Sequence, residues 1–456
     1  MLYERQLSER VAQSESVRQA AKLQAVEAER TTVLEKLKQD HKAELEKLER
    51  ENTDLRRQLA DAIESAKPAP TPAEVAERVR AVRELAFTRM PEWTPAPPEE
   101  ILQKLSSQAA SQITPEESSA RARAMVAMGF VTEPFDYRTV TGELAQIRSG
   151  GFFDPAASRF LYQKDASLAR ADSREAFAGA LLPVLIGQNF PAALPSAPPV
   201  DPENDDASRA LRALASGDAS FFRVYFALGD KLRANNDRGQ GPTPPLQPTA
   251  PQFMAEMLKW TEDSGNLFVT SLHMKGGVTA VNNAYARPPR SSAEILHPEQ
   301  LYLANPPFEP VKVSFGDTSI NGTAPFFSNV AGEAAMFFLV RGWADVDTAE
   351  TATVGWAGDR YAVWAGAKEY GDHVLWRTVW TTDKDAEEFF ATLRTGLMSR
   401  HLIPWQKEYD VTPGQFRVDD PHRIIRLVRD GKTVTLIDAT DAAFAQAAAE
   451  KFLNAR

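Results

Sequence analysis

The side chains best suited to catalysis or metal binding are sparse in this chain and poorly spaced for a shared site. The 456 residues include no cysteine, which excludes thiolate metal sites, thiol nucleophiles and disulfides. The histidines are His41, His273, His297, His373, His401 and His422. No two of them stand in a His-x-His or His-x-x-x-His pair, the spacing that lets two imidazoles reach one metal ion. The histidines therefore predict no metal centre.

Other short motifs that could carry chemistry also lack the neighbours they need. Ser216 is not surrounded by a Gly-x-Ser-x-Gly nucleophile motif. The acidic run Asp201–Asp206 lacks the spaced ligands and terminal glutamate of a calcium loop, and we interpret it as a solvated start of a helix. Lys275-Gly276-Gly277 lacks the flanks of a phosphate-binding loop and predicts a turn. His297, in a Leu-His-Pro sequence, is interpreted as a structural turn histidine.

A group of aromatic residues in the last third of the chain allows two interpretations. They are Trp356, Tyr361, Trp364, Trp376 and Trp380. They could line a groove for a ligand. Aromatic side chains at strand spacing more often fill a core or cover a sheet face, and we favour that interpretation.

One apolar segment resembles a helix whose chemistry is known. Residues 175–190 read EAFAGALLPVLIGQNF. This segment resembles the zinc-binding helix of a little-characterised family of bacterial gluzincin-type metallopeptidase-like proteins, in which the helix reads approximately AHELTHALQDQHF. Alignment on the shared Gln188-x-Phe190 places Gly179 and Pro183 at the two histidines. Ala180 then stands at the catalytic glutamate.

Further motifs in the same order extend the resemblance over about residues 75–400. Ser216-Gly-Asp-Ala219 is similar to the Glu-Gly-Asp-Ala sequence that supplies the third zinc ligand in the family. The other similar segments are 128–137, 150–155, 285–298, 356–361 and 376–380. The resemblance implies a gluzincin-like fold in which Ser216 replaces the last ligand.

The four substituted positions remove the chemistry that the resemblance would otherwise imply. A catalytic zinc needs three protein ligands and an open position for water. Two histidines one helical turn apart supply two of the ligands, and the glutamate between them acts as general base. Gly179, Ala180, Pro183 and Ser216 offer neither imidazole nor carboxylate. We therefore expect a degenerate member with no catalytic residue, metal or cofactor, in which Pro183 makes the helix bend or begin late.

The first part of the chain predicts a coiled coil over residues 1–66. Apolar residues recur at alternating spacings of three and four, which is typical of a coiled-coil seam. The predicted interface consists of Leu45, Leu48, Asn52, Leu55 and Leu59, with Asn52 at a core position. The repeat slips between Leu37 and Leu45, so we expect local unwinding there. The alternative is a single solvated helix carrying charge pairs.

The remaining sequence predicts an α+β protein in two further parts. A proline-rich linker at 67–72 is followed by a mostly helical, degenerate metallopeptidase-like domain with a small sheet at 73–307, then by an α+β C-terminal domain at 308–456. Helices are expected from Ala73 onward and at 99–112, 115–128, 207–228, 252–259, 267–275, 330–341, 384–397 and 441–453. Strands are expected within 152–165 and at 311–315, 360–364 and 374–380, with a hairpin over 423–437 that turns at Asp430-Gly431. An exposed loop is expected at 238–251.

Composition limits the classes of function. A hydrophobic fraction of 43% and a charged fraction of 25% are ordinary for a globular protein. A net charge of −10 argues against a nucleic-acid partner, and no apolar run is long enough for a membrane span. The start of the chain does not resemble a signal peptide, so we expect a cytoplasmic protein if Met1 is the native start, and an exported or anchored one if an upstream signal was removed.

The sequence thus predicts a non-enzymatic function. The favoured hypothesis is a structural or interaction subunit that forms a homo-oligomer, or docks on a protein partner, through the coiled coil. One alternative is a binding module that holds a peptide in the vestigial cleft. The other is a hydrolase with a displaced site.

Overall fold

The structure, a computed structural model, describes residues 36, 39, 41–56, 58–59, 69–148, 150–194, 201–233, 250–367, 371–406 and 409–453. The described residues from Ala69 onward form one compact unit, and the earlier ones belong to a separate unit. The predicted boundary at residue 308 lies inside the larger unit. Most of the predicted loop at 238–251 lies outside the described residues.

The smaller unit is described only in part, and there it is helical. Residues 36, 39, 41–56, 58 and 59 are helical, and all of them are exposed. The rest of the predicted coiled coil, including residues 1–35 and the start of the linker, lies outside the described residues. A helix is therefore confirmed for these residues, and the coiled-coil pairing stays a prediction.

The first half of the larger unit is mostly helical. Its helices are α2 (Pro72–Arg83), α3 (Pro98–Ser111), α4 (Pro115–Met128), α5 (Tyr137–Ala145), α6 (Ala171–Asn189), α7 (Asp205–Arg233), α8 (Gln252–Ala286) and α9 (Ser292–Leu296), with short turns η1 (Gln146–Arg148), η2 (Pro191–Ala193) and η3 (Pro298–Tyr302). Local sequence fixes several ends: Thr71 and Glu74 form a capping box on α2, and Gly129 ends α4 in the left-handed conformation.

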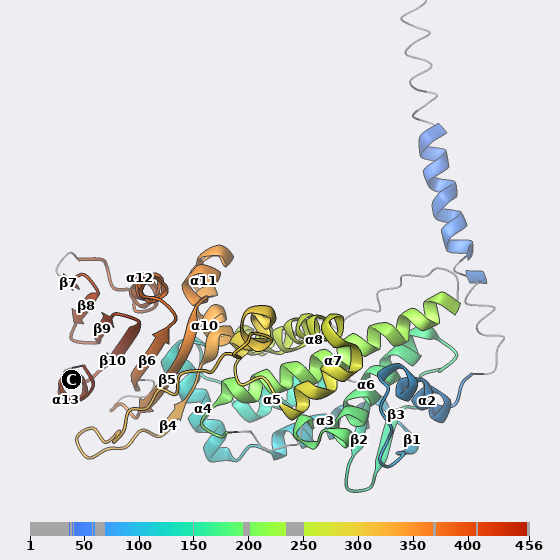
Figure 1. The fold of residues 1–456 in the computed structure, drawn as a ribbon, viewed down its shortest axis with the longest axis horizontal. Coiled ribbons are helices and arrows are strands. Elements are labelled where there is room, and N and C mark those ends of the chain that lie inside the picture. The colour runs from blue at the N-terminus through green and yellow to red at the C-terminus, as the bar shows by residue number, and fades with distance from the viewer. Residues whose placement is uncertain are drawn as a thin grey trace, which may run out of the picture. The chain divides into compact units, whose positions relative to one another are not determined.

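A small sheet accompanies these helices. Its strands are β1 (Glu92–Ala96), β2 (Gly151–Asp154) and β3 (Arg159–Gln163), in the order β1-β3-β2. β1 runs parallel to β3 and β2 antiparallel. This confirms the small sheet and the predicted strand region. Figure 1 shows these strands beside α2 and α6, away from the larger sheet.

The long helices α7 and α8 form the centre of the helical half. They approach each other so closely at Gly217 and Gly265 that a Cβ on either residue would overlap backbone atoms of the other helix. α8 is interrupted at Gly276 and Gly277, whose backbone angles are not helical. The predicted turn at these glycines is confirmed. The predicted gap between residues 259 and 267 is wrong, because the buried side chains of Trp260 and Thr261 continue the face that packs in the core.

The second half of the larger unit contains a seven-stranded sheet. The strands are β4 (Phe327–Asn329), β5 (Trp356–Trp364), β6 (His373–Trp380), β7 (Asp410–Thr412), β8 (Gln415–Asp419), β9 (Ile424–Asp430) and β10 (Thr433–Ala439). The order is β4-β5-β6-β10-β9-β8-β7 and every pairing is antiparallel. The helices are α10 (Gly332–Arg341), α11 (Val346–Thr353), α12 (Asp383–Arg400) and α13 (Ala442–Phe452). The predicted α+β class is confirmed.

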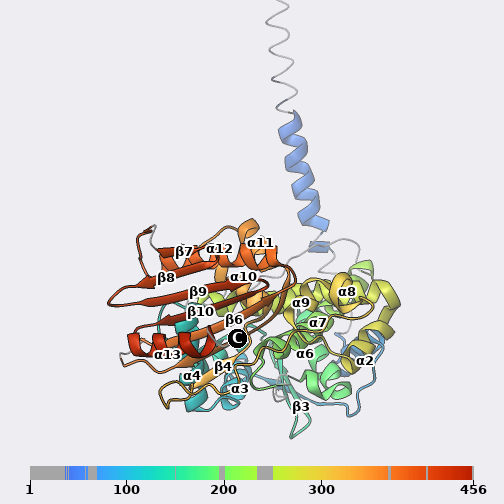
Figure 2. The same ribbon diagram turned by 60° about the vertical axis from the view of Figure 1, so that its left-hand side comes forward.

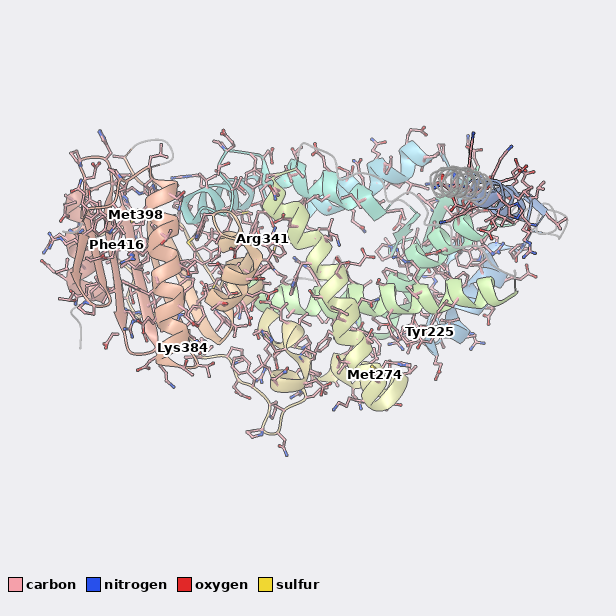
Figure 3. The ribbon with its side chains drawn as sticks, turned by 90° about the horizontal axis from the view of Figure 1, so that it is seen from above. Tyr225, Met274, Arg341, Lys384, Met398 and Phe416 are labelled. Atoms are coloured by element: carbon pink, nitrogen blue, oxygen red, sulfur yellow. The ribbon has the colours of Figure 1, made fainter. Side chains whose placement is uncertain are left out.

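Helices cover both faces of this sheet. α12 contributes Phe389 and Leu393 to the core on one face. Figure 2 shows α12 beside the sheet, and Lys384 and Met398 mark the ends of α12 in Figure 3. α13 contributes Phe444 and Ala448 to the core on the other face. α4 also adds Met128 to the α12 core, although it belongs to the first half. The helical half has a core of its own, and α4 joins it to the core beneath α12.

Two predictions in this half need correction. Residues 311–315 form no strand, and their link to the sheet is the Val311 amide, which donates to the Ala357 carbonyl at 2.7 Å. The hairpin of β9 and β10 is confirmed, but Asp430 pairs with Thr433, so its two turn residues are Gly431 and Lys432. The positive φ of 53° falls on Gly431, where a glycine costs least.

Within the described part of the chain, no helix combines the length and apolar character needed to cross a bilayer.

Candidate functional site

Three of the four positions that the resemblance aligns with zinc-site residues lie on α6. Gly179, Ala180 and Pro183 are all partly exposed, whereas Leu181 and Leu182 between them are buried. α6 begins at Ala171 and continues through Pro183, so the expectation that the segment begins late is wrong. Because proline has no N–H, the Gly179 carbonyl receives no α-helical hydrogen bond from position 183. Burial of neighbouring residues such as Leu185 and Ile186 holds the helix together across this gap.

The fourth position, Ser216, lies on the neighbouring helix α7. It is partly buried, and α7 packs against α6. Arg223 follows about two helical turns further along α7, so the two side chains share a face. The structure therefore places all four predicted positions on two adjacent helices.

Arg223 covers the position where the resemblance would place the first histidine. A Cβ built on Gly179 would lie 3.0 Å from Arg223 Cδ, so the arginine stem occupies the space that a side chain at 179 would need. The guanidinium Nη2 donates to Glu262 Oε1 of α8 at 3.2 Å, and Nε lies 4.0 Å from Glu175 Oε1 of α6. We call Glu175, Arg223 and Glu262 the charge triad. Its side chains are 38–39% exposed, so these charges are partly screened by water.

The residues at this place do not fit a zinc ion. The four aligned positions supply no imidazole or carboxylate. The stem of Arg223 lies over Gly179, and its positive charge would repel a cation bound nearby. Among the residues that the structure describes, no three histidine, aspartate or glutamate side chains gather closely enough to bind a metal ion.

A buried ion pair joins Arg83 to Asp218, which is close to Ser216 in the sequence, and two partly buried side chains extend the pair into a cluster. Arg83 of α2 donates from Nε to Asp218 Oδ1 at 2.7 Å and from Nη2 to Asp218 Oδ2 at 2.9 Å. Arg83 Nη2 also donates to Asn282 Oδ1, and the Tyr285 hydroxyl donates to Asp218 Oδ2 at 2.8 Å. Burial, together with the adjacent Asp218 carboxylate, raises the pKa of the Tyr285 hydroxyl well above its ordinary value. The tyrosine therefore stays protonated and donates.

This cluster brings together two of the segments on which the resemblance rests. Asp218 belongs to the Ser-Gly-Asp-Ala segment, and Tyr285 opens the segment at 285–298. The ring of Tyr285 also stacks on Phe190, the last residue of the α6 motif, with centroids 4.1 Å apart. In this structure these residues hold α2, α6, α7 and α8 together, and a buried ion pair of this kind cannot lose one partner without exposing the other charge to an apolar core.

The tryptophan segments form a second buried cluster, around Asp359. Its carboxylate accepts hydrogen bonds from the indole N–H groups of Trp356 and Trp376, each at 3.0 Å. It also accepts from the backbone amides of Ala331 and Gly332 at the start of α10. Trp356, Tyr361, Trp364, Trp376 and Trp380 are all at most 5% exposed. The interpretation of these aromatic residues as core is confirmed.

His297 and the acidic run at 201–206, both considered as possible sites, take part in the packing of helices. His297 caps the end of α9, and its Nε2 lies 2.7 Å from the buried Glu333 carboxylate, whose hydrogen bond raises the pKa of His297. The acidic run starts α7: Asp206 is buried, with Oδ2 accepting from the Ser292 amide at 2.9 Å and Oδ1 from Arg209 at 3.2 Å. Asp206 was expected to be solvated, and it is instead part of the core between α7, α9 and α10.

Sequence reasoning missed Arg83, Asp218, Arg223 and Glu262. For Asp218 a signal was present, because it lies at helical spacing between Leu214 and Phe222 on the apolar face of α7. A single charge on such a face predicts a buried ion pair. Its partner Arg83 could not be identified, since it lies 135 residues away in the sequence.

Comparison with known protein families finds a match for one part of the chain. Residues 324–449 match a family described as a domain of unknown function, DUF8575. This range runs from just before β4 into α13 and so contains the whole seven-stranded sheet, but not the charge triad or the N-terminal helix. No curated protein and no solved structure matches the chain.

Proposed function

We propose that this chain is a non-catalytic pseudo-metallopeptidase, related to the gluzincin-type family, that acts as a structural or interaction subunit. The observation that carries the proposal is Arg223, whose stem covers Gly179 and whose guanidinium joins Glu175 and Glu262. A zinc peptidase needs that space for an imidazole and a metal ion. Here the stem of Arg223 occupies that space, and its guanidinium lies between Glu175 of α6 and Glu262 of α8.

The N-terminal helix supplies the means of assembly. Its four leucines at the predicted interface are 46–64% exposed, although leucine is a residue that proteins normally bury. An exposed apolar stripe on an otherwise charged helix favours association with another helix. We infer that the chain forms an oligomer or docks on a partner through this stripe.

A second candidate function is capture of a peptide over the charge triad. The partial exposure of Glu175, Arg223 and Glu262 favours it, because groups of both signs remain open to a ligand's termini or side chains. A hydrolase with a displaced site has no comparable support in the described residues.

Metal analysis tests the pseudo-enzyme proposal. The purified full chain is stripped with a chelator, incubated with excess zinc, dialysed and assayed by elemental analysis. We expect much less than one zinc per chain. About one zinc per chain would contradict the proposal.

A variant that restores the family's residues provides the matched comparison. It combines Gly179→His, Ala180→Glu, Pro183→His and Ser216→Glu with Arg223→Ala, which removes the side chain that lies over position 179. We expect this variant to retain zinc where the natural chain does not. If it folds, as judged by circular dichroism, but binds no zinc, the alignment on Gln188-x-Phe190 loses its support.

Light scattering tests assembly. We expect the full chain to have a mass that is a multiple of 50.3 kDa, and a chain that begins at Ala69 to be a monomer. A monomeric mass for both the full chain and the shortened chain would contradict assembly through the N-terminal helix.

A further inference from the structure

The N-terminal helix carries a stripe of side chains that nothing in its own unit covers among the described residues. Leu45, Leu48, Leu55 and Leu59 are 46%, 55%, 64% and 61% exposed. Their spacing places Leu45 and Leu59 at a positions and Leu48 and Leu55 at d positions of consecutive heptads, with Asn52 at the a position between them. We call these five residues the heptad stripe.

We propose that the heptad stripe pairs with the heptad stripe of a second copy of this chain, parallel and in register, so that Asn52 contacts Asn52 of the other copy. The inference rests on the proposed function in that it requires assembly through this helix. It goes further by specifying the partner, the number of chains and their orientation. In both copies the chain would then continue from the same end of the paired helix.

Asn52 decides the orientation. In a parallel, in-register pair each a residue faces the a residue of the other chain, so the two amides can donate to and accept from each other. In an antiparallel pair a positions face d positions, and each Asn52 would face Leu48 or Leu55 of the other copy. The amide would then be buried against a leucine with no partner, which is the costlier arrangement.

Asn52 also favours two chains over three or four. A single buried asparagine at an a position specifies register and oligomer state at some cost in stability. The neighbouring layers at Leu48 and Leu55 are ordinary leucine d layers, which suit a two-stranded coil. The combination therefore favours a dimer.

Charges beside the stripe support the same register locally. Glu51 occupies a g position and Arg56 the following e position, so a parallel pair brings Glu51 of each chain next to Arg56 of the other. One heptad earlier, Glu44 and Glu49 occupy the corresponding positions and repel. Charge complementarity is thus confined to the heptad around Asn52, and the asparagine contact is the stronger determinant.

Cross-linking tests the orientation in the full chain. Because the natural sequence has no cysteine, Leu48→Cys and Leu55→Cys each introduce a single thiol at a d position. A parallel, in-register dimer brings each position to its own counterpart, within reach of a disulfide. An antiparallel pair can do so for at most one of the two positions, since they are two helical turns apart. The matched control is Arg50→Cys, on the outer face of the same helix.

We expect both d-position variants to form covalent dimers of about twice 50.3 kDa on non-reducing gels under mild oxidation, and the control to form few. Light scattering on the natural chain distinguishes failure of the parallel dimer from failure of the proposed assembly. Dimers by scattering with at most one cross-linking d position would overturn the parallel arrangement and leave the proposed function standing. Trimers or larger assemblies would overturn the two-chain inference. Monomers would overturn both the inference and the proposed assembly.

Discussion

At the scale of single residues, the buried Arg83–Asp218 pair is where one substitution has the largest expected effect. Replacing Asp218 with Asn removes the negative charge and leaves the Arg83 guanidinium buried without its counter-ion. We expect Asp218→Asn to lower the free energy of unfolding by about 3–5 kcal/mol in urea titrations, the usual cost of breaking a buried pair.

An exposed ion pair on the same helix supplies the control. Arg80 and Glu77 of α2 bond at 2.8 Å, but both side chains are about half exposed. Glu77→Gln should change the unfolding free energy by less than about 1 kcal/mol. Equal effects of the two substitutions would mean that burial does not control the strength of the Arg83–Asp218 interaction.

A second prediction at this scale concerns the pH dependence of stability. Burial raises the pKa of the Asp206 carboxyl from 3.8 to about 6, with Asp359 adding to the shift and Arg209 opposing it. Between about pH 4 and pH 6 the folded chain therefore holds a proton that the unfolded chain has released. Stability from this group is fully present below pH 4 and is lost as the pH rises through 6.

Asp206→Asn removes the titration but keeps an oxygen for the Ser292 amide. The unfolding free energy of the natural chain, minus that of the variant, should fall by up to about 3 kcal/mol between pH 4 and pH 7. Urea unfolding of both proteins at four pH values measures this difference. Parallel stability curves for the two proteins would show that Asp206 titrates near its ordinary pKa.

At the scale of secondary-structure elements, the contact of α7 with α8 at Gly217 makes a clear prediction. An added Cβ at Gly217 would overlap the Gly265 backbone, so Gly217→Ala should cost at least about 2 kcal/mol although alanine is the better helix former. Gly229 lies on the same helix, where the nearest atom to an added Cβ is Arg78 Nη2 at 3.9 Å. Gly229→Ala should therefore stabilise the protein by up to about 1 kcal/mol.

Thermal unfolding of the two variants, compared with the natural chain, checks this pair. A lower midpoint for Gly217→Ala and an unchanged or higher one for Gly229→Ala is the expected pattern. Stabilisation by both substitutions would mean that the helices separate easily and that helix propensity dominates.

Elements with strong local signals were predicted well from the sequence. α4 was predicted at its observed bounds, because Thr114, Pro115 and Gly129 mark its start and end. The β9–β10 hairpin was found from its alternating strands and glycine turn. Residues 311–315 alternate in the same way, but an apolar alternation does not show whether a partner strand is available. That information lies in the tertiary structure.

The site was predictable only for the residues that the motifs contain. Gly179, Ala180, Pro183 and Ser216 lie on the neighbouring helices α6 and α7, and their equivalence to a zinc site stays a prediction. Arg223, which lies over Gly179, has no feature in the sequence that distinguishes it from the other charged residues of α7. Its role depends on the packing of α6, α7 and α8, which no local pattern specifies.

At the scale of the whole molecule, contacts between the two halves of the larger unit predict that they unfold together. Arg400 of α12 donates from Nη2 to the Val126 and Ala127 carbonyls at the end of α4, and Arg123 of α4 pairs with Asp372 beside β6. Destabilising the helical half with Asp218→Asn should therefore speed global exchange of backbone amides in β6 and β10 as well as in α7. Hydrogen exchange followed by mass spectrometry measures this. Unchanged exchange in the sheet would show that the halves unfold independently.

The strand order of the large sheet has a consequence for how the chain is made. β10 lies between β6 and β9, and it is the last strand in the sequence. During synthesis from the N-terminus, more than 50 residues are added after β6 before its neighbour β10 is made. Until then, the apolar edge of β6 is open to other chains. Nascent chains that stop before residue 433 should therefore depend most on chaperones and aggregate most readily.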